Sequence, residues 1–439
     1  MRLWRNGTAT PRCPSETSGL SPREQSDHDC RFGRRVPEGE VRRRGHGAGH
    51  AARRAGYDRA MKRQVLILGA GFGGLELATR LSETVSDVVD VTLLDRNDSF
   101  YFGFSKLEVM LGRQSADAVR LPYRDIAKDG VEFRRETVVG IDPGARRVVT
   151  DVGTHDADLL VVAMGADYDM AATPGFEDGG YEYYSLAGAE RLRDALTDFE
   201  SGRVLVSVLG QPFKCPPAPF EGSFLLHEHF TQRGIRDAVE MVTTFPMQRP
   251  VPVTGPVSQM FRDALASRGI EELSQHLVTS IDPTARVARL ATGETLPYDL
   301  FVGIPVHRAP DPLAASGLAV NGWVPVDQTN LRTRFPHVYA LGDVCTGPRT
   351  VPKAGIFAEA AARVVADDIT AEISSDDPPA PYEGSGVCYA EFGGGLVSKV
   401  EVNFLRGESP AAERHEPSLE YAAEKAQFGA TRRARWFGS

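Results

Sequence analysis

One glycine-rich segment constrains the fold of this chain more than any other feature. Residues 64–68 form a continuous apolar run typical of a buried parallel strand, and Gly-Ala-Gly-Phe-Gly-Gly follows directly at residues 69–74. A helical pattern comes next, and then a second apolar strand over residues 88–94, which leads into Asp95, 21 residues after Gly74. The order strand, G-x-G-x-x-G loop, helix, strand and acid predicts a dinucleotide-binding α/β fold.

The residues of this segment have separate expected roles. Gly69 permits the tight turn, Gly71 admits the pyrophosphate, and Gly74 lets helix and strand pack closely. The helix N-terminus faces the phosphates, and Asp95 accepts hydrogen bonds from the ribose hydroxyls. The predicted cofactor-binding residues here are Gly69, Gly71, Phe72, Gly73, Gly74 and Asp95.

Composition is that of a globular protein of two or three domains, with 439 residues. No apolar run approaches the roughly 18 residues of a spanning helix, so an integral membrane protein is excluded. The first 60 residues differ, with thirteen arginines against seven acidic residues. We predict a disordered extension there, or sequence upstream of a start at Met61, with an arginine-rich targeting arm as the alternative. The rest holds 37 basic and 52 acidic residues, which argues against nucleic acid as a partner.

The cysteines indicate redox or buried residues rather than structural disulfides. Cys13 and Cys30 lie in the first 60 residues, whereas Cys215, Cys345 and Cys388 lie far apart in the body of the chain. A large chain without an export signal is not expected to rely on disulfides for stability. No Cys-x-x-Cys pair or Cys/His cluster has zinc spacing, so no metal site is predicted.

A second nucleotide signal lies near residue 340, where a short strand ends in Gly342-Asp343. Lys353 and an alanine-rich helix over residues 355–369 follow. This pattern, with the strand end at Gly165, resembles the flavoproteins of the glutathione-reductase type, which have two dinucleotide domains. The resemblance implies that Asp343 binds the FAD ribityl chain and that the helix N-terminus stabilises negative charge on the reduced flavin.

The middle of the chain has the rhythm of a second dinucleotide domain without its glycine loop. The predicted strands cover residues 204–209, 239–245, 277–281, 287–290 and 300–304. Where the glycines would lie, the sequence has Cys215 followed by Pro216, Pro217 and Pro219. Proline removes N–H donors and adds bulk, so a nicotinamide nucleotide site is not expected and another reductant is needed.

The segment Lys214-Cys215-Pro216-Pro217-Ala218-Pro219 resembles that of sulfide:quinone oxidoreductases and flavocytochrome c sulfide dehydrogenases. The resemblance covers nearly all of residues 61–438. It implies that Cys215 lies over the flavin and pairs with Cys388 as the catalytic redox couple. It further implies that sulfide attacks this disulfide and that the freed thiolate reduces the FAD. The resemblance also implies that the sulfane sulfur leaves to a thiol and that a quinone accepts the electrons.

The residues themselves support a reactive Cys215. Lys214 and a helix N-terminus both lower a thiol pKa, and Pro216 fits the first turn of a helix. The alternative is a buried apolar cysteine beside a rigid proline turn. Cys345 is interpreted as a buried filler residue and kept as a reserve partner for Cys215.

Three further features remain open. Glu221 is either a proton acceptor near the thiol or an ordinary acid of a first helical turn, and His307 is a candidate for proton transfer. A predicted helix over residues 419–439 carries Lys425, several arginines, Trp436 and Phe437. It either contacts an anionic membrane surface or docks on its own protein.

Two departures from the resembling families matter. Residues 101–104, where flavocytochrome c attaches FAD covalently, hold no cysteine, so we expect FAD to be bound non-covalently. A third cysteine found in many quinone reductases is replaced by Ala166-Asp167, which makes sulfide less secure as the substrate.

The predicted fold is α/β, with two Rossmann-like dinucleotide-binding domains and a small C-terminal region. The expected parts are a disordered extension (1–60), a discontinuous FAD-binding domain (61–168 and 301–380), a second Rossmann-like domain (169–300) and a C-terminal strand and helix region (381–439).

The predicted function is FAD-dependent oxidation of sulfide or a small thiol, with a quinone as acceptor. The alternatives are a type II NADH dehydrogenase-like flavoprotein and a flavin-bearing redox sensor. The expected location is the cytoplasm, with peripheral contact to the inner face of the cell membrane, and a homodimer is a further option.

Overall fold

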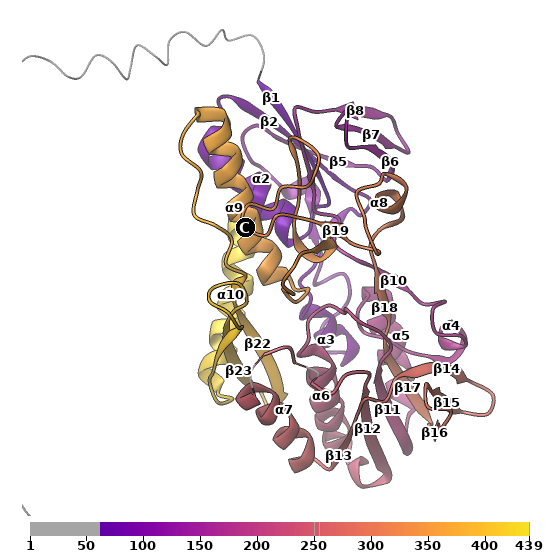
Figure 1. Cartoon of the computed structure of the whole chain (residues 1–439). Coiled ribbons are helices and arrows are strands. Elements are labelled where there is room, and N and C mark those ends of the chain that lie inside the picture. Colours follow the sequence, from indigo (N-terminus) through magenta and orange to yellow (C-terminus); the bar gives the residue numbers. More distant parts are fainter. Residues whose placement is uncertain (1–61, 250, 254, 439) are drawn as a thin grey trace, which may run out of the picture. The chain divides into compact units, whose positions relative to one another are not determined.

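The computed structural model describes residues 62–249, 251–253 and 255–438 (Figure 1). The predicted disordered extension over residues 1–60 lies outside this part of the chain. Two parallel sheets and one antiparallel sheet form the framework, together with several small sheets. The parallel sheets confirm the predicted α/β class, whereas the exact domain limits stay a prediction.

The first large sheet is parallel, and its strands lie in the order β20-β9-β1-β2-β5. Their apolar residues are buried on both faces, as expected for a parallel sheet covered by other elements. Two helices, α2 and α9, pack against each other beside it (Figure 1). The bounds are β1 Arg63–Leu68, α2 Phe72–Val85, β2 Val89–Asp95, β5 Val131–Arg135, β9 Leu159–Val162, β20 Val338–Ala340 and α9 Gly355–Ser374.

The second large sheet is also parallel, with the strand order β13-β12-β11-β17. Strands β11, β12 and β17 lie where the sequence predicts them, but β13 was not predicted, and the strands predicted over 277–281 and 287–290 belong to a separate antiparallel sheet. Three helices accompany the parallel sheet. The bounds are α5 Leu186–Asp198, β11 Gly202–Val208, α6 Ala218–Gln232, β12 Val239–Phe245, α7 Gly255–Ser267, β13 Ile270–Ser274 and β17 Leu300–Ile304. A small antiparallel sheet inserted before β17 consists of β14 Val278–Asp282, β15 Val287–Leu290 and β16 Thr295–Pro297.

The C-terminal region is an antiparallel sheet followed by a long helix (Figure 1). Its elements are β22 Ser385–Gly393, β23 Leu396–Asn403, β24 Ala411–Arg414 and α10 Leu419–Phe437. Strand β22 contacts both α6 of the second sheet and α9 of the first. This strand carries Cys388, so the C-terminal region brings that cysteine toward the loop that precedes α6.

The chain passes between the two large sheets twice, and the two crossings, β10 Asp167–Asp169 and β18 Val306–Arg308, pair antiparallel. The remaining elements are short. They are β3 Ser99–Phe100, α3 Ser105–Met110, β4 Leu121–Pro122, η2 Tyr123–Asp125, β6 Val138–Asp142, β7 Arg147–Thr150, β8 Thr154–Asp156, α4 Phe176–Gly179, η3 Arg236–Ala238, α8 Asp311–Ala315, β19 Val324–Pro325, η4 Gly342–Val344 and β21 Cys345–Thr346.

Among the helices that the structure describes, none has both the length and the apolar character needed to cross a membrane.

Candidate functional site

The glycine loop between β1 and α2 is shaped by close backbone contacts. Gly69 has φ +102°, and a Cβ there would lie 2.4 Å from the carbonyl oxygen of Ala163. A Cβ at Gly74 would lie 1.9 Å from the carbonyl oxygen of Gly69. Both positions therefore require glycine, which agrees with the roles predicted for the turn and for helix packing.

Gly71 differs from these two glycines. A Cβ at Gly71 would meet no protein atom within 4 Å, and its φ of −79° suits any residue. Gly71 is also the N-cap of α2, and no side chain caps the helix there. Open space in front of uncapped backbone N–H groups is what a pyrophosphate requires.

Asp95, at the end of β2, supports this loop. One carboxylate oxygen accepts the Ala70 N–H (2.8 Å), and the other accepts the Asn97 N–H (2.8 Å). The carboxylate is thus fixed beside the glycine loop, at the position where the fold places a ribose-binding acid. Its contact with a ribose remains a prediction.

Asp343 follows β20 in η4, and its Oδ1 is buried without a hydrogen-bond partner among the described residues. Burial raises the pKa of this carboxyl group, although the nearby ammonium groups of Lys214 and Lys353 act in the opposite direction. A buried acceptor without a partner is costly, so the orphaned oxygen points to a donor that a bound group supplies, such as a ribityl hydroxyl.

Lys353, predicted to bind the cofactor, contacts the turn that holds Asp343. Its Nζ donates to the carbonyl oxygens of Asp343 (2.5 Å) and Cys345 (3.3 Å) and lies 3.5 Å from the ring centroid of Trp323. Burial lowers its pKa to about 8. Lys353 therefore braces the Gly342-Asp343 turn, and direct contact of its side chain with a cofactor stays a prediction.

These segments enclose a cavity of about 330 Å³, called the first cavity below. It continues from the glycine loop past Asp343 to the loop before α6 and to β22. The N-terminus of α9 also faces it, with Ala354 as an N-cap that has no capping side chain. The predicted site residues that line it are Gly71, Phe72, Gly73, Gly165, Cys215, Gly342, Asp343 and Cys388.

The donor set and the space fit FAD. An uncapped helix N-terminus with open space suits the pyrophosphate, and the orphaned Asp343 oxygen suits a ribityl hydroxyl. The uncapped N-terminus of α9 suits negative charge on a reduced flavin. These three features all face the first cavity.

The two cysteines predicted as a redox pair line the same cavity as free thiols. Cys215 has φ +54°, a left-handed conformation that is strained for a non-glycine residue, by ~1–3 kcal/mol. It also precedes a proline, and its N–H donates to the carbonyl oxygen of Lys353 (2.7 Å). A strained backbone held this firmly in a cavity indicates a functional residue. Cys345 does not line the first cavity.

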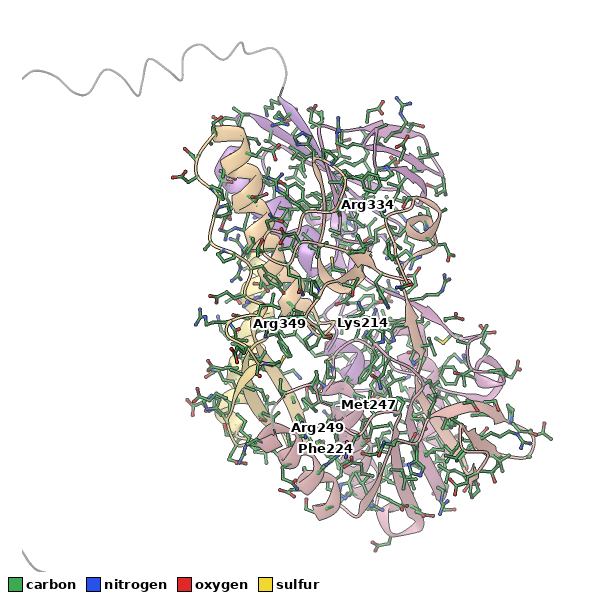
Figure 2. All side chains as sticks on the ribbon, viewed as in Figure 1. Lys214, Phe224, Met247, Arg249, Arg334 and Arg349 are labelled. Carbon is green, nitrogen blue, oxygen red and sulfur yellow. The ribbon has the colours of Figure 1, made fainter. Side chains whose placement is uncertain are left out.

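Two sequence expectations about Cys215 are wrong. Lys214 is not among the groups that influence the Cys215 pKa most. Its Nζ donates to the Ala166 carbonyl oxygen (3.0 Å) and lies over the ring of Tyr168, between the two large sheets (Figure 2). Burial is the largest influence, and together with Glu221 and Cys388 it raises the Cys215 pKa well above its usual value. The groups that lower it are the Ala218 N–H and Lys106.

The first turn of α6 also differs from expectation. The helix begins at Ala218 with Pro217 as N-cap, so Pro216 precedes the helix instead of lying in its first turn. Tyr183 packs against the first half of α6, because its hydroxyl donates to the Ala218 carbonyl oxygen (2.8 Å) and lies 2.3 Å from a Cβ built at Gly222. A side chain at Gly222 would therefore clash with Tyr183.

Glu221 and His307 behave differently in the structure. Glu221 is buried, lines the first cavity with both cysteines, and accepts the Glu391 N–H (3.0 Å); burial raises its pKa to about 7. His307 does not line this cavity. Its Nε2 accepts the Lys214 N–H (3.3 Å), so its Nδ1 donates to the Pro305 carbonyl oxygen (2.7 Å). Burial lowers the His307 pKa to about 3. A role in proton transfer stays a prediction for both residues.

The sequence analysis did not identify three residues of the first cavity: Lys106 in α3, and Lys425 and Phe428 in α10. Lys106 donates to the Tyr184 carbonyl oxygen (2.5 Å), and burial lowers its pKa to about 8. Lys425 is buried and pairs with Glu391. No local sequence pattern marks these residues, because each depends on a contact between distant segments.

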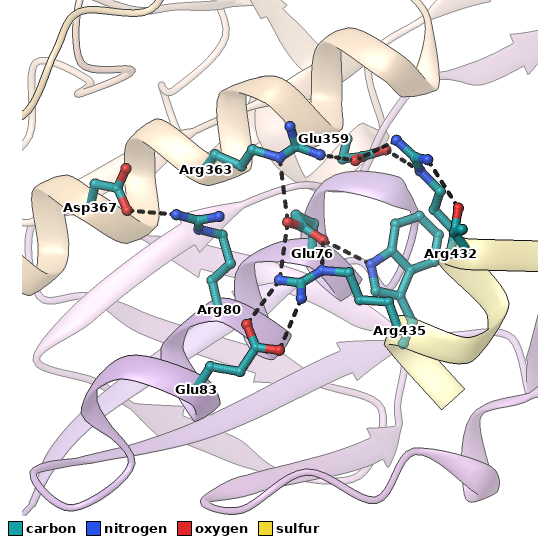
Figure 3. A network of polar contacts seen from close by, with 10 residues as sticks. Glu76, Arg80, Glu83, Glu359, Arg363, Asp367, Arg432 and Arg435 are labelled. Atoms are coloured by element: carbon teal, nitrogen blue, oxygen red, sulfur yellow. Dashed lines mark hydrogen bonds and ion pairs between the residues drawn. The ribbon is translucent and has the colours of Figure 1, made fainter. Parts of the chain in front are cut away.

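The C-terminal helix docks on its own protein. Trp436 is fully buried, and its Nε1 donates to Glu76 of α2 (2.9 Å), which also accepts from Arg435 (2.9 Å) (Figure 3). Arg432 pairs with Glu359 of α9 in the same network. The basic and aromatic side chains considered for a membrane surface are therefore largely occupied by contacts within the chain.

Among the described residues, no group of three or more His, Cys, Asp or Glu is arranged to hold a metal ion.

The fold and the first cavity define a flavoprotein with two dinucleotide-binding folds. The family model described as pyridine nucleotide-disulphide oxidoreductase matches residues 63–210 and 230–356. The chain therefore belongs to this family and is an FAD-dependent oxidoreductase.

Two known proteins and one solved structure illustrate the similarity. The sulfide-quinone reductase of Aquifex aeolicus is 26% identical over 359 residues, which cover 76% of this chain and 82% of that protein. The type II NADH:quinone oxidoreductase of Staphylococcus saprophyticus is 32% identical over 139 residues, which cover 31% of this chain and 35% of that protein. The solved structure of the Aquifex aeolicus sulfide:quinone oxidoreductase superimposes with a TM-score of 0.73 at 22% identity, covering 84% of this chain and 90% of that one.

Proposed function

We propose that the protein oxidises sulfide through Cys215 and Cys388 and passes the electrons through FAD to a quinone. The observation that carries this proposal is the meeting of the two cysteines, from segments far apart in the sequence, in the cavity that fits the flavin. The similarity to sulfide-quinone reductases supports it, and so does the loop after β11, where prolines replace the glycines of a nucleotide site.

The chemistry starts from the oxidised pair. Hydrosulfide attacks one sulfur of a Cys215–Cys388 disulfide, so a new S–S bond forms as the old one breaks, leaving a persulfide on one cysteine and a thiolate on the other. Bound FAD supplies the two-electron acceptor. Glu221 takes up the proton, because a carboxyl group with a pKa of about 7 can change protonation state at neutral pH.

The quinone is proposed to reach the flavin from the side of α10. A neighbouring cavity, the third cavity, shares the lining residues Ile356, Val387, Tyr389 and Phe428 with the first. These four shared residues are mostly apolar, which suits a planar quinone ring, whereas charged side chains such as Glu359 and Arg363 line the outer part of the third cavity. The Lys425–Glu391 pair beside them offers a proton source for the reduced product.

FAD is proposed to be bound without a covalent link. Tyr101, Gly103 and Phe104 line the first cavity, and this segment offers no cysteine for attachment. Acid or heat denaturation should release all of the flavin into the supernatant, and flavin retained by the protein would contradict this proposal.

A quinone acceptor also favours peripheral attachment to the inner face of the cell membrane, and a homodimer remains a prediction.

Anaerobic titration of the FAD-loaded protein tests the proposed function. Sulfide should bleach the flavin absorbance rapidly, and Cys215→Ser and Cys388→Ser should each abolish rapid bleaching. Unchanged bleaching in either variant would overturn the proposed cysteine chemistry. Rapid bleaching by NADH would instead favour a type II NADH dehydrogenase-like activity, which the short match to that class keeps as the second candidate. A redox sensor would bleach without steady quinone turnover.

A further inference from the structure

Two buried side chains hold the backbone of Lys214, the residue before Cys215. The Lys214 N–H donates to Nε2 of His307 (3.3 Å), and the Lys214 carbonyl oxygen accepts a hydrogen bond from the Tyr184 hydroxyl (3.0 Å). His307 and Tyr184 are each 5% exposed. Both polar groups of this backbone are therefore bonded to side chains, whereas a regular helix or strand uses backbone partners.

Cys215 itself has a conformation that needs support. Its φ is +54°, and it precedes Pro216, whose ring further restricts the residue before it. The Cys215 N–H donates to the Lys353 carbonyl oxygen (2.7 Å), and the Cys215 carbonyl oxygen accepts the Ala218 N–H (2.8 Å). Strained conformations of this kind persist only where the surroundings fix them, so contacts at this position and the one before it hold the thiol in place.

His307 is fixed as a hydrogen-bond acceptor. Its Nδ1 donates to the Pro305 carbonyl oxygen (2.7 Å), so Nε2 carries no proton and accepts the Lys214 N–H. Burial lowers its pKa to about 3, and the ring is therefore neutral at physiological pH. The rings of Tyr168 and Tyr184 pack edge-on against it, at centroid distances of 5.0 Å and 5.6 Å. The tautomer and the orientation of His307 are thus both set for one contact.

Tyr168 ties the two ends of this arrangement together. It lies in β10, directly opposite His307 in β18, where the chain crosses between the two large sheets. Its hydroxyl donates to the Tyr184 carbonyl oxygen (2.8 Å), which also accepts from Lys106 (2.5 Å). The clamp, defined as His307 and Tyr184 with their bonds to Lys214, is therefore anchored at this crossing (Figure 2).

We propose that His307 and Tyr184 are positioning residues that hold Cys215 in the conformation in which its thiol meets Cys388. This inference rests on the proposed function, because it concerns the Cys215–Cys388 pair. Both cysteines line the first cavity, and a disulfide between them has a specific geometry that requires the Cys215 thiol to stay there.

The clamp should favour the disulfide over the two thiols. Without the clamp, Cys215 can relax from its strained backbone while its thiol is free, but formation of the disulfide forces the strain back. Loss of the clamp thus stabilises the reduced pair relative to the oxidised pair and raises the reduction potential. Because hydrosulfide attacks the disulfide, the clamp keeps the protein in the form that can react.

Equilibration with dithiothreitol measures this effect directly. The FAD-loaded protein is held without oxygen in graded ratios of reduced and oxidised dithiothreitol. As the Cys215–Cys388 bond forms, oxidised dithiothreitol takes up the two electrons and two protons of the thiols, and its own S–S bond breaks. Acid quenching, alkylation and mass spectrometry then give the fraction of protein that carries the disulfide.

His307→Leu removes the acceptor and leaves the Lys214 N–H without its partner, whereas Tyr184→Phe removes only the hydroxyl and keeps the packing of the ring. Each variant should lower the equilibrium constant for disulfide formation about tenfold, which corresponds to a rise of about 30 mV in the reduction potential of the pair. His307→Gln should restore the constant to within about threefold of the wild-type value, because its side-chain oxygen lies as many bonds from the backbone as Nε2.

Tyr298→Phe is the matched control. Tyr298 is also 5% exposed, and its hydroxyl donates to the Asp282 carbonyl oxygen (3.4 Å). It lines neither the first cavity nor the second cavity, a space of about 460 Å³ beside Pro216 and Cys345. Its variant should leave the equilibrium constant unchanged.

Unchanged constants in both His307→Leu and Tyr184→Phe would overturn the inference, and so would an equal loss in Tyr298→Phe. An equal loss in His307→Gln would overturn the role of the His307 acceptor.

The equilibrium with dithiothreitol needs neither sulfide nor quinone, so its outcome is separate from that of the proposed function. Sulfide bleaching of the wild-type flavin without a shift in the two variants would reject the clamp and retain the function. Shifted constants in a protein that sulfide does not bleach would retain the clamp and reject sulfide as the substrate.

Discussion

The contact between Glu76 and the C-terminal helix α10 should control electron transfer to the quinone. Glu76 is 1% exposed, and its carboxylate accepts hydrogen bonds from Arg435 (2.9 Å) and from Trp436 (2.9 Å). Glu76→Gln keeps the shape and one acceptor oxygen but removes the charge. Removing one partner of a buried ion pair costs about 3–5 kcal/mol, and partial exposure of Arg435 reduces this to about 2–3 kcal/mol.

This loss should appear as local opening of α10. A cost of about 2–3 kcal/mol corresponds to roughly 30- to 150-fold faster hydrogen exchange of the amides near the end of α10. Because α10 supplies Lys425 and Phe428 to the first cavity, quinone reduction should slow while sulfide bleaching of the flavin is retained. The measurements are exchange followed by mass spectrometry and the two half-reactions followed by stopped flow.

Glu83→Gln is the matched control. Glu83 also pairs with Arg435, at 2.9 Å, but its side chain is 48% exposed, so its loss should cost less than about 1 kcal/mol. Equal exchange in the two variants, or less than a threefold rise in Glu76→Gln, would refute the reasoning.

The pH dependence of docking has a definite sign. Burial raises the pKa of Glu76, but hydrogen bonds from Arg435 and Trp436 outweigh it, so the net pKa is lowered from 4.5. The stabilisation by Glu76 is therefore present above that value and is lost as the pH falls through the lowered pKa.

Four other substitutions give distinct outcomes. Gly71→Ala should weaken FAD binding at least tenfold without destabilising the apoprotein, because its Cβ would meet no protein atom. Gly74→Ala should destabilise the apoprotein itself, because its Cβ would lie 1.9 Å from a carbonyl oxygen. Titration with FAD measures the first effect, and thermal unfolding measures the second. Cys345→Ser should keep the sulfide bleaching rate within twofold, because Cys345 does not line the first cavity. A larger decrease in this rate would instead indicate that Cys345 is the partner of Cys215. Glu221→Gln should remove the rise in bleaching rate through pH about 7, and a persistent rise would assign that proton to another group.

The sequence predicted the parts of the fold that depend on local pattern. The apolar run of β1 and the glycines after it specify a strand and a turn within a few residues, and the structure has both where expected. The two cysteines proposed to react lie outside the segments that the family model matches. The family model passes over residues 211–229 and stops at residue 356, so neither Cys215 nor Cys388 falls within its match.

Contacts between distant segments could not be predicted in this way. Trp436 belongs to a helix whose composition suits a membrane surface, yet its burial depends on Glu76, which is 360 positions away in the sequence. The bonds of Lys214 to Tyr184 and His307 likewise join three separate segments, and neither bond follows from a recognised motif.

The choice between Lys214 and Lys106 as the cation that acts on Cys215 shows most directly why contacts between distant segments escape sequence analysis. Sequence adjacency favours Lys214, but its ammonium group is engaged by Ala166 and Tyr168, whereas Lys106 from α3 lowers the thiol pKa across the cavity. In a Cys388→Ser background, Lys106→Met should slow alkylation of Cys215 about fivefold at pH 7, where Lys106, with a pKa of about 8, is mostly charged and a charge interaction of ~1 kcal/mol is lost. Lys214→Met should change the rate less than twofold. Mass spectrometry of the Cys215 peptide gives both rates, and a larger effect of Lys214→Met would restore the assignment based on sequence adjacency.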